Sequence, residues 1–248
     1  AGAEPVGLLV TLLLPPTSTL EEAAQIADDL AAAAQMANVD VLGGHTEVTD
    51  AVTRPVTSVT VVARQPRGGA LSGMKPGDDI VLTKSAAVEG TAILAEDFAD
   101  RLSGVSTETL ERSRAFSGKL SIVPESRLAL QLGAHAMHDV TEGGVLGAVW
   151  ELAFAGGCAA DVSSNKILVR PETTALCGAL GLDPLRLIGS GSLLVAIENG
   201  DALVKLLASR GIEASVIGRA IPGDVSFLDG EPMDEPHADE IYRLYDRF

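Results

Sequence analysis

Aromatic side chains are scarce in this chain of 248 residues, which has five Phe, two Tyr and one Trp, or 3% of the total. Proteins that bind single-stranded nucleic acid stack the bases on aromatic rings, so this scarcity argues against that function. Basic residues are also outnumbered, because 18 Lys and Arg face 34 Asp and Glu and give a formal net charge of −16. A chain this acidic repels polyanions, and we therefore expect no nucleic acid and no membrane surface among its partners.

Cysteines and long apolar runs are few as well. The two cysteines, Cys158 and Cys177, form no CxxC motif, which is typical of a reducing compartment and predicts a cytoplasmic protein. The longest strongly apolar run, residues 6–14, is too short to span a bilayer and lacks the basic flank of a signal peptide. With 46% hydrophobic and 21% charged residues, the composition excludes general disorder and permits one large or two small domains.

Hydrophobic patterning predicts a mixed α+β chain with no regular βαβ repeat. Thr19 and Glu22 form a capping box ahead of an Ala-rich helix that extends to Ala37. The glycine-rich residues 65–69 are the expected linker, which divides the chain into domains 1–65 and 66–223 and a tail, 224–248. We expect strands at 6–14, 39–42, 55–63, 79–84, 192–197 and 215–220, and further helices at 90–102, 107–116, 124–132, 145–154, 201–210 and 239–245.

Residues 138–144 are the first candidate site. Gly143 and Gly144 precede a helix, where free backbone N–H groups and the helix dipole favour a phosphate. Asp139 and Glu142 stand just ahead, and carboxylates beside a phosphate require a cation such as Mg²⁺ between them. The segment therefore suggests a metal–nucleotide site. Asp139, Thr141 or Glu142 could equally serve only to cap the next helix.

Two further segments have a weaker signal. Gly43-Gly44-His45-Thr46 follows a short strand, and glycines followed by polar residues after a strand are typical of a ligand-binding loop. Lys84 ends a predicted strand and could meet a phosphate. An ordinary glycine turn and a solvated lysine are the alternatives for these two segments.

Taken together, six segments resemble the AIR synthase-related superfamily, which includes aminoimidazole ribonucleotide (AIR) synthetase, thiamine-monophosphate kinase, selenophosphate synthetase and a hydrogenase-maturation dehydratase. They lie in the family's order and cover about residues 1 to 220. The segments are residues 2–9, 43–47, 77–84, 89–94, 138–144 and 190–194.

This resemblance implies a two-domain α+β fold. The N-terminal domain would form an intersubunit β-barrel in a homodimer, and the C-terminal domain would be α/β with a mixed sheet. The implied cofactors are ATP and Mg²⁺. The implied reaction activates an oxygen atom of a small or carrier-bound substrate by phosphoryl transfer, in hydrogenase maturation or a related process.

The resemblance also assigns roles to residues. Asp139 resembles the family's metal-binding aspartate, and His45 stands where some relatives have a second one. The expected ATP-binding residues are Gly43, Gly44, Thr46, Lys84, Thr141, Gly143 and Gly144. Relatives carry a glycine-rich acidic segment that we expect upstream of Ala1, and the dehydratase ends in a cysteine where this chain ends in Phe248. Two alternatives stay open: a non-catalytic homodimeric binding or assembly protein, and a selenophosphate synthetase-like enzyme.

Overall fold

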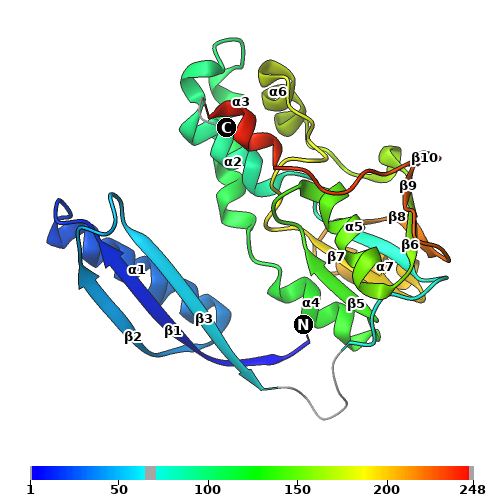
Figure 1. The fold of residues 1–248 in the computed structure, drawn as a ribbon, viewed down its shortest axis with the longest axis horizontal. Coiled ribbons are helices and arrows are strands. Elements are labelled where there is room, and N and C mark those ends of the chain that lie inside the picture. The colour runs from blue at the N-terminus through cyan, green and yellow to red at the C-terminus, as the bar shows by residue number, and fades with distance from the viewer. Residues whose placement is uncertain (1, 65–70, 246–248) are drawn as a thin grey trace. The chain divides into compact units, whose positions relative to one another are not determined.

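The computed structural model describes residues 2–64 and 71–245, which form two compact units with those bounds (Figure 1). We call them the N-unit and the C-unit. The predicted linker at 65–69 lies outside the described residues. Within the described parts of the chain, no helix is long and apolar enough to cross a membrane.

The N-unit is a three-stranded sheet with one helix. Strand β1 (Glu4–Leu14) lies in the centre, parallel to β2 (Asp40–Val48) and antiparallel to β3 (Val56–Arg64). Helix α1 (Leu20–Ala37) connects β1 to β2. The predicted capping box is confirmed, because the Glu22 N–H donates to the Thr19 hydroxyl and the Thr19 N–H donates to the Glu22 carboxylate. The local sequence therefore determines where α1 begins.

The N-unit leaves much of its sheet exposed. Every residue of β2 and β3 is exposed, and the unit buries few large side chains, chiefly Leu12 and Leu14. Apolar residues with 41% to 64% of their surface exposed lie on all three strands: Val6, Leu9, Val41, Leu42, Val48, Val56, Val59, Val61 and Val62. Neighbours such as Val61 and Val62 point to opposite faces of the sheet, and exposed apolar residues in this number are typical of an interaction surface.

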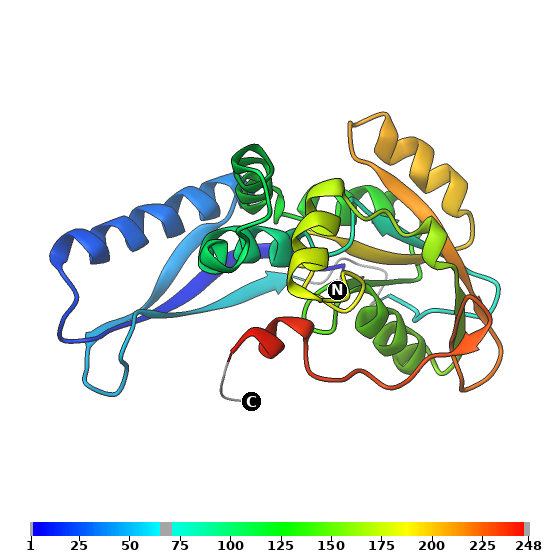
Figure 2. The same cartoon turned by 90° about the horizontal axis from the view of Figure 1, so that it is seen from above.

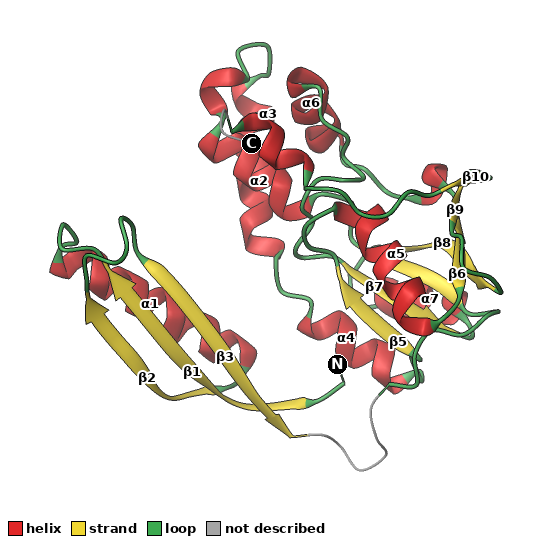
Figure 3. Ribbon diagram, viewed as in Figure 1, coloured by secondary structure: helices red, strands yellow, loops and turns green. Residues whose placement is uncertain are grey.

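The C-unit contains a seven-stranded mixed sheet in the order β10-β9-β6-β8-β4-β7-β5 (Figure 3). Only β6 and β9 are parallel; every other neighbouring pair is antiparallel. The strands are β4 (Asp79–Thr83), β5 (Ala136–Asp139), β6 (Ala159–Val162), β7 (Leu193–Ile197), β8 (Ala214–Ile221), β9 (Phe227–Leu228) and β10 (Glu231–Pro232).

Helices cover both faces of this sheet (Figure 2). Ile80 and Leu82 of β4 pack in the cluster that holds α5, whereas Val81 packs against α4 and α7, as the alternation of side chains along a strand requires. A third apolar cluster joins α2, α6 and a 3₁₀ turn at Glu240–Leu244. The helices are α2 (Val88–Asp97), α3 (Thr107–Arg114), α4 (Val123–Gln131), α5 (Gly144–Gly156), α6 (Pro171–Leu180) and α7 (Gly200–Ala208).

The α+β class is confirmed, but the expected loop at 43–47 is wrong. Gly43 and Gly44 continue β2, where they pair with Leu9 and Val10 of β1. The glycines indicated a break in the chain, but in a strand they also permit close approach to a neighbouring backbone. The patterns also missed the short strands β5, β6, β9 and β10 and the ten-residue helix α6, and the expected terminal helix is a 3₁₀ turn.

Candidate functional site

The sheet brings the polar segments of the C-unit to one edge. Strands β4 and β5 end where β7 and β8 begin, because these neighbours are antiparallel. The loops at this edge are bonded to one another: the Val140 N–H donates to the Ser192 carbonyl at 3.1 Å, and the Ser192 hydroxyl donates to the Ser85 carbonyl at 2.6 Å. We call this region the β4–β5 edge. It unites segments that are far apart in the sequence.

Glycines at this edge allow its loops to pack closely. A Cβ atom on Gly144, whose φ is +61°, would lie 2.6 Å from the Leu185 carbonyl oxygen. A Cβ on Gly189 would lie 2.7 Å from a methyl group of Val140. Real Cβ atoms do not approach other atoms this closely. A side chain at position 144 would require a backbone shift, and one at position 189 would displace the Val140 side chain. Packing therefore explains the glycine at position 144, whether or not a phosphate also approaches it.

The N–H groups of Gly143 and Gly144 already have acceptors. The Gly143 N–H donates to the Asp239 carboxylate at 2.8 Å, and the Gly144 N–H donates to the Thr141 carbonyl at 3.1 Å. Asp239 is only 2% exposed and also accepts from the Ile241 N–H at 2.9 Å. A carboxylate of the chain itself thus occupies the start of α5, where the helix dipole favours an anion. Sequence reasoning missed Asp239, since no local pattern shows a partner 96 residues away.

Burial sets the ionisation of Asp239. It raises the pKa of this carboxyl above its ordinary value and outweighs the backbone N–H groups that favour the charged form. The charge of nearby Glu142 raises the pKa further. The carboxyl therefore binds its proton more tightly in the folded chain than in the unfolded one.

Lys84 takes part in a buried ion pair. Its ammonium group donates to the carbonyls of Ser121 at 2.8 Å and Gly191 at 2.6 Å, and it pairs with Glu125, whose side chain is 1% exposed. Two of the three ammonium hydrogens go to the backbone carbonyls, whereas the contact with Glu125 is an ion pair, and among the described residues neither carboxylate oxygen of Glu125 has a hydrogen-bond partner. In this arrangement Glu125 balances the charge of Lys84 within the protein. It links α4 to the turn before β7, and Glu125 is a second residue that the sequence did not reveal.

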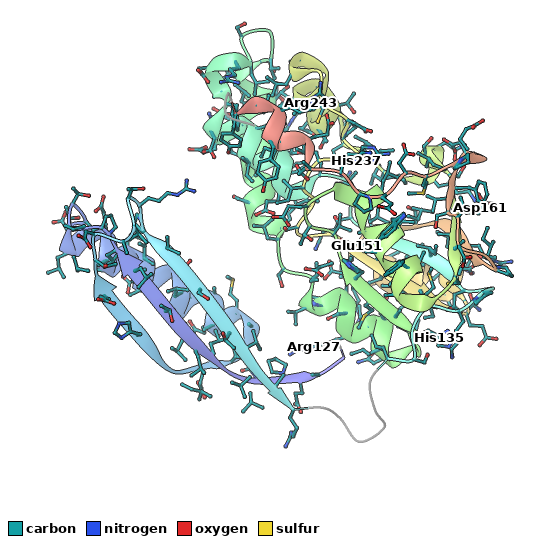
Figure 4. All side chains as sticks on the ribbon, in the orientation of Figure 1. Arg127, His135, Glu151, Asp161, His237 and Arg243 are labelled. Atoms are coloured by element: carbon teal, nitrogen blue, oxygen red, sulfur yellow. The ribbon has the colours of Figure 1, made fainter. Side chains whose placement is uncertain are left out.

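Asp139 and Thr141 lie at the same edge. The side chain of Asp139 is 61% exposed at the end of β5, and Thr141 is half-buried in the loop that follows. The neighbouring His138 lies 3.2 Å from the carboxylate of Glu151 in α5. Figure 4 labels Glu151. Within residues 2–64 and 71–245 no group of three His, Cys, Asp or Glu side chains could hold a metal ion. One exposed carboxylate still suits Mg²⁺, which takes most of its ligands from water and substrate phosphates.

The remaining predicted residues lie in the N-unit. Gly43, Gly44, His45 and Thr46 line a hollow of about 480 Å³ between β2 and α1, together with Val10, Leu12, Val41, Ala27, Leu30 and Ala31. This volume is within the range of small-molecule sites. The His45 Nε2 atom lies 3.3 Å from the Glu47 carboxylate, and both side chains are exposed. Among the residues that the structure describes, no Lys or Arg lines the hollow, so its chemistry fits an apolar ring better than a phosphate.

Comparison with known protein families agrees with this architecture. Residues 1–65 match the model of the AIR synthase related protein, N-terminal domain, and residues 75–230 match that of the C-terminal domain. The chain therefore belongs to the AIR synthase related family. The resemblance inferred from the six segments is confirmed.

Individual curated relatives are similar to this chain over most of its length. The chain is 32% identical over 246 residues to the carbamoyl dehydratase HypE of Azotobacter vinelandii, covering 93% of this chain and 68% of that protein. It is 30% identical over 229 residues to HypE of Rhodobacter capsulatus, covering 89% of this chain and 65% of that protein. Against several curated relatives, the chain thus spans just under two thirds of their length.

Solved structures share the fold. A crystal structure of E. coli HypE superposes with a TM-score of 0.83 at 23% identity and covers 98% of this chain and 77% of that one. A thiamine monophosphate kinase of Aquifex aeolicus gives a TM-score of 0.75 at 17% identity, covering 94% and 76%. The expected two-domain AIR synthetase-like fold is therefore confirmed.

The first prediction concerns Gly44. A Cβ there would lie 1.8 Å from the Val10 carbonyl oxygen, whereas a Cβ on Gly43 would meet nothing within 4 Å. We expect Gly44→Ala to destabilise the N-unit by about 1–3 kcal/mol or more, and Gly43→Ala to cost clearly less. Residues 2–64 contain no aromatic side chain, so hydrogen exchange of the β1 and β2 amides is the measurement. Equal protection in the two variants would contradict the packing argument.

The second prediction concerns the buried ion pair. Lys84→Met leaves the Glu125 carboxylate buried without a counter-charge, and we expect the free energy of unfolding to fall by about 3–5 kcal/mol. The double variant Lys84→Met/Glu125→Leu should recover most of this loss. Lys205→Met, an exposed lysine on α7, is the control and should stay within about 0.5 kcal/mol. Urea unfolding followed by Trp150 fluorescence measures all three, and a double variant as unstable as Lys84→Met would refute the expectation.

The third prediction concerns pH. Since the pKa of Asp239 is raised on folding, the stability linked to its proton is complete below the ordinary value of 3.8 and is lost as the pH rises through the raised pKa. We expect the free energy of unfolding of the natural chain, relative to that of Asp239→Asn, to decrease over this window. Urea unfolding at several pH values tests it, with the exposed Asp234→Asn as the matched control. Parallel profiles for the two variants would show that Asp239 is not responsible.

Proposed function

We propose that this chain is the ATP-binding part of an ATP-dependent enzyme of hydrogenase maturation, which activates an oxygen atom of a small or carrier-bound substrate by phosphoryl transfer. The similarity to carbamoyl dehydratase HypE over about nine tenths of the chain carries this proposal. One HypE structure of the same fold is described in complex with ATP, and a thiamine monophosphate kinase structure in complex with AMPPCP and TMP. The cytoplasm is the proposed location, since Cys158 and Cys177 are free thiols.

Each unit offers a candidate site of its own. In the N-unit, the hollow beside Gly43, Gly44 and Thr46 would take a flat apolar ring, because its lining is largely apolar and Gly43 and Gly44 have no side chain. At the β4–β5 edge, Asp139 would hold Mg²⁺ together with phosphate oxygens, and Thr141 would offer its hydroxyl. Bound Mg-ATP supplies the phosphoryl group that turns a substrate oxygen into a leaving group.

The other residues that were predicted to bind phosphate already have partners within the protein. The donor groups of Lys84, Gly143 and Gly144 are bonded to protein acceptors, so we propose that they support the edge. His45 pairs with Glu47, and a metal at this position would compete with that contact. Asp139 is therefore the residue on which we base the test.

We propose a homodimer through the N-unit sheet. The apolar residues of β1, β2 and β3 that remain exposed, and the free edges of β2 and β3, support it, because a second copy would cover both. A structure of a HypE–HypF complex shows that a protein of this fold also has a different protein partner. If this chain also binds a partner protein, that partner could carry the substrate.

The fourth prediction tests the site. Calorimetric titration of ATP into the 248-residue chain should give saturable binding that requires Mg²⁺ and is abolished by EDTA. Asp139→Asn should weaken this binding at least about tenfold, because the cation loses its protein carboxylate. Asp234→Asn, which removes an exposed carboxylate elsewhere, is the control and should bind ATP normally. The absence of binding to the natural chain, or unchanged binding to Asp139→Asn, would overturn the assignment.

A further inference from the structure

Helix α5 carries an aromatic pair at its solvent-facing end. The rings of Trp150 and Phe154 stack one helical turn apart, with centroids 5.1 Å apart and planes 8° from parallel. Most of the helix is buried against the sheet, yet Phe154 is 73% exposed. Aromatic side chains, and Trp above all, are typical anchors of protein interfaces. An aromatic pair with one ring this exposed is therefore a candidate contact for a partner.

This pair borders a hollow of about 340 Å³, which we call the aromatic hollow. Its lining comes from α5 and from the chain on either side of β9 and β10: Trp150, Ala153, Phe154, Gly157, Cys158, Asp224, Ser226 and Glu235. It involves none of the residues assigned above to the nucleotide. The hollow thus combines a ring surface with two carboxylates.

The two carboxylates have no counter-charge in the described part of the chain. Asp224 and Glu235 are both exposed, and neither forms an ion pair or a side-chain hydrogen bond there. The surrounding segment is acidic throughout, because residues 221–242 contain seven Asp and Glu and no Lys or Arg. A positively charged group would therefore be attracted to the hollow and would meet unpaired acceptors there.

We propose that the aromatic hollow binds an arginine side chain of a partner protein. A guanidinium group is planar, so it can stack on the rings while its N–H groups donate to a carboxylate. Lysine offers a compact, strongly hydrated charge with no stacking plane. The acidic segment would draw in a basic stretch of the partner, and the arginine would anchor it. This inference does not depend on the proposed ATP site.

Trp150 makes the test direct, because it is the only tryptophan in the chain. The probe is the peptide acetyl-Leu-Arg-Leu-amide, titrated into the whole chain while tryptophan emission is recorded. We expect a saturable change with a dissociation constant on the order of 1 mM, as befits one anchor. The citrulline peptide has the same shape without the charge and should give no saturable change, and the lysine peptide should bind at least about fivefold more weakly.

Matched variants separate the site from general charge attraction. Asp224→Asn/Glu235→Gln should weaken arginine-peptide binding at least about fivefold, and Phe154→Ala should do the same. Glu231→Gln/Asp234→Asn removes equal charge from the same segment without touching the lining, and it should bind like the natural chain. Circular dichroism checks that every variant is folded. A citrulline or lysine peptide that binds as well, equal losses in both double variants, or no saturable response would each overturn the proposal.

Discussion

The close packing of loops at the β4–β5 edge is the constraint on which the rest of the C-unit depends. Antiparallel pairing brings the ends of β4 and β5 beside the starts of β7 and β8. Glycine at position 144 lets its loop approach the backbone at 185–187, and glycine at position 189 makes room for the Val140 side chain. Lys84 and Asp239 then bond these loops to α4 and to the tail. The edge is therefore one connected unit, so a change in one loop is felt by the others.

The local sequence was enough to predict those helices and strands whose folding depends on neighbouring residues. The capping box and apolar spacing predicted α1, and alternation predicted β3, because both depend on neighbours a few residues away. The order of the six segments was enough to indicate the family, since together they extend over both units of the chain. Short strands such as β5 and β6, with four residues each, gave no such signal and were missed.

The candidate site was only partly predictable. The motif residues at 84 and 139–144 do lie at one edge, but the sequence could not show which of their donors are already bonded. The partners of Gly143 and Lys84, namely Asp239 and Glu125, are chosen by tertiary packing and not by spacing. The Gly43-Gly44 pair illustrates the same limit, because two glycines are typical of a turn, whereas here Gly44 lets β2 approach the Val10 backbone closely.

The bond between Asp239 and Gly143 also bears on synthesis of the chain. The first turn of α5 receives its carboxylate from a residue 96 positions later. On the ribosome, this helix emerges long before its partner, so the C-unit completes its native bonding only after the tail has left the exit tunnel. This unit therefore completes its folding only after Asp239 has emerged, and until then its nascent form exposes the helix start and the apolar cluster that residues 240–244 complete.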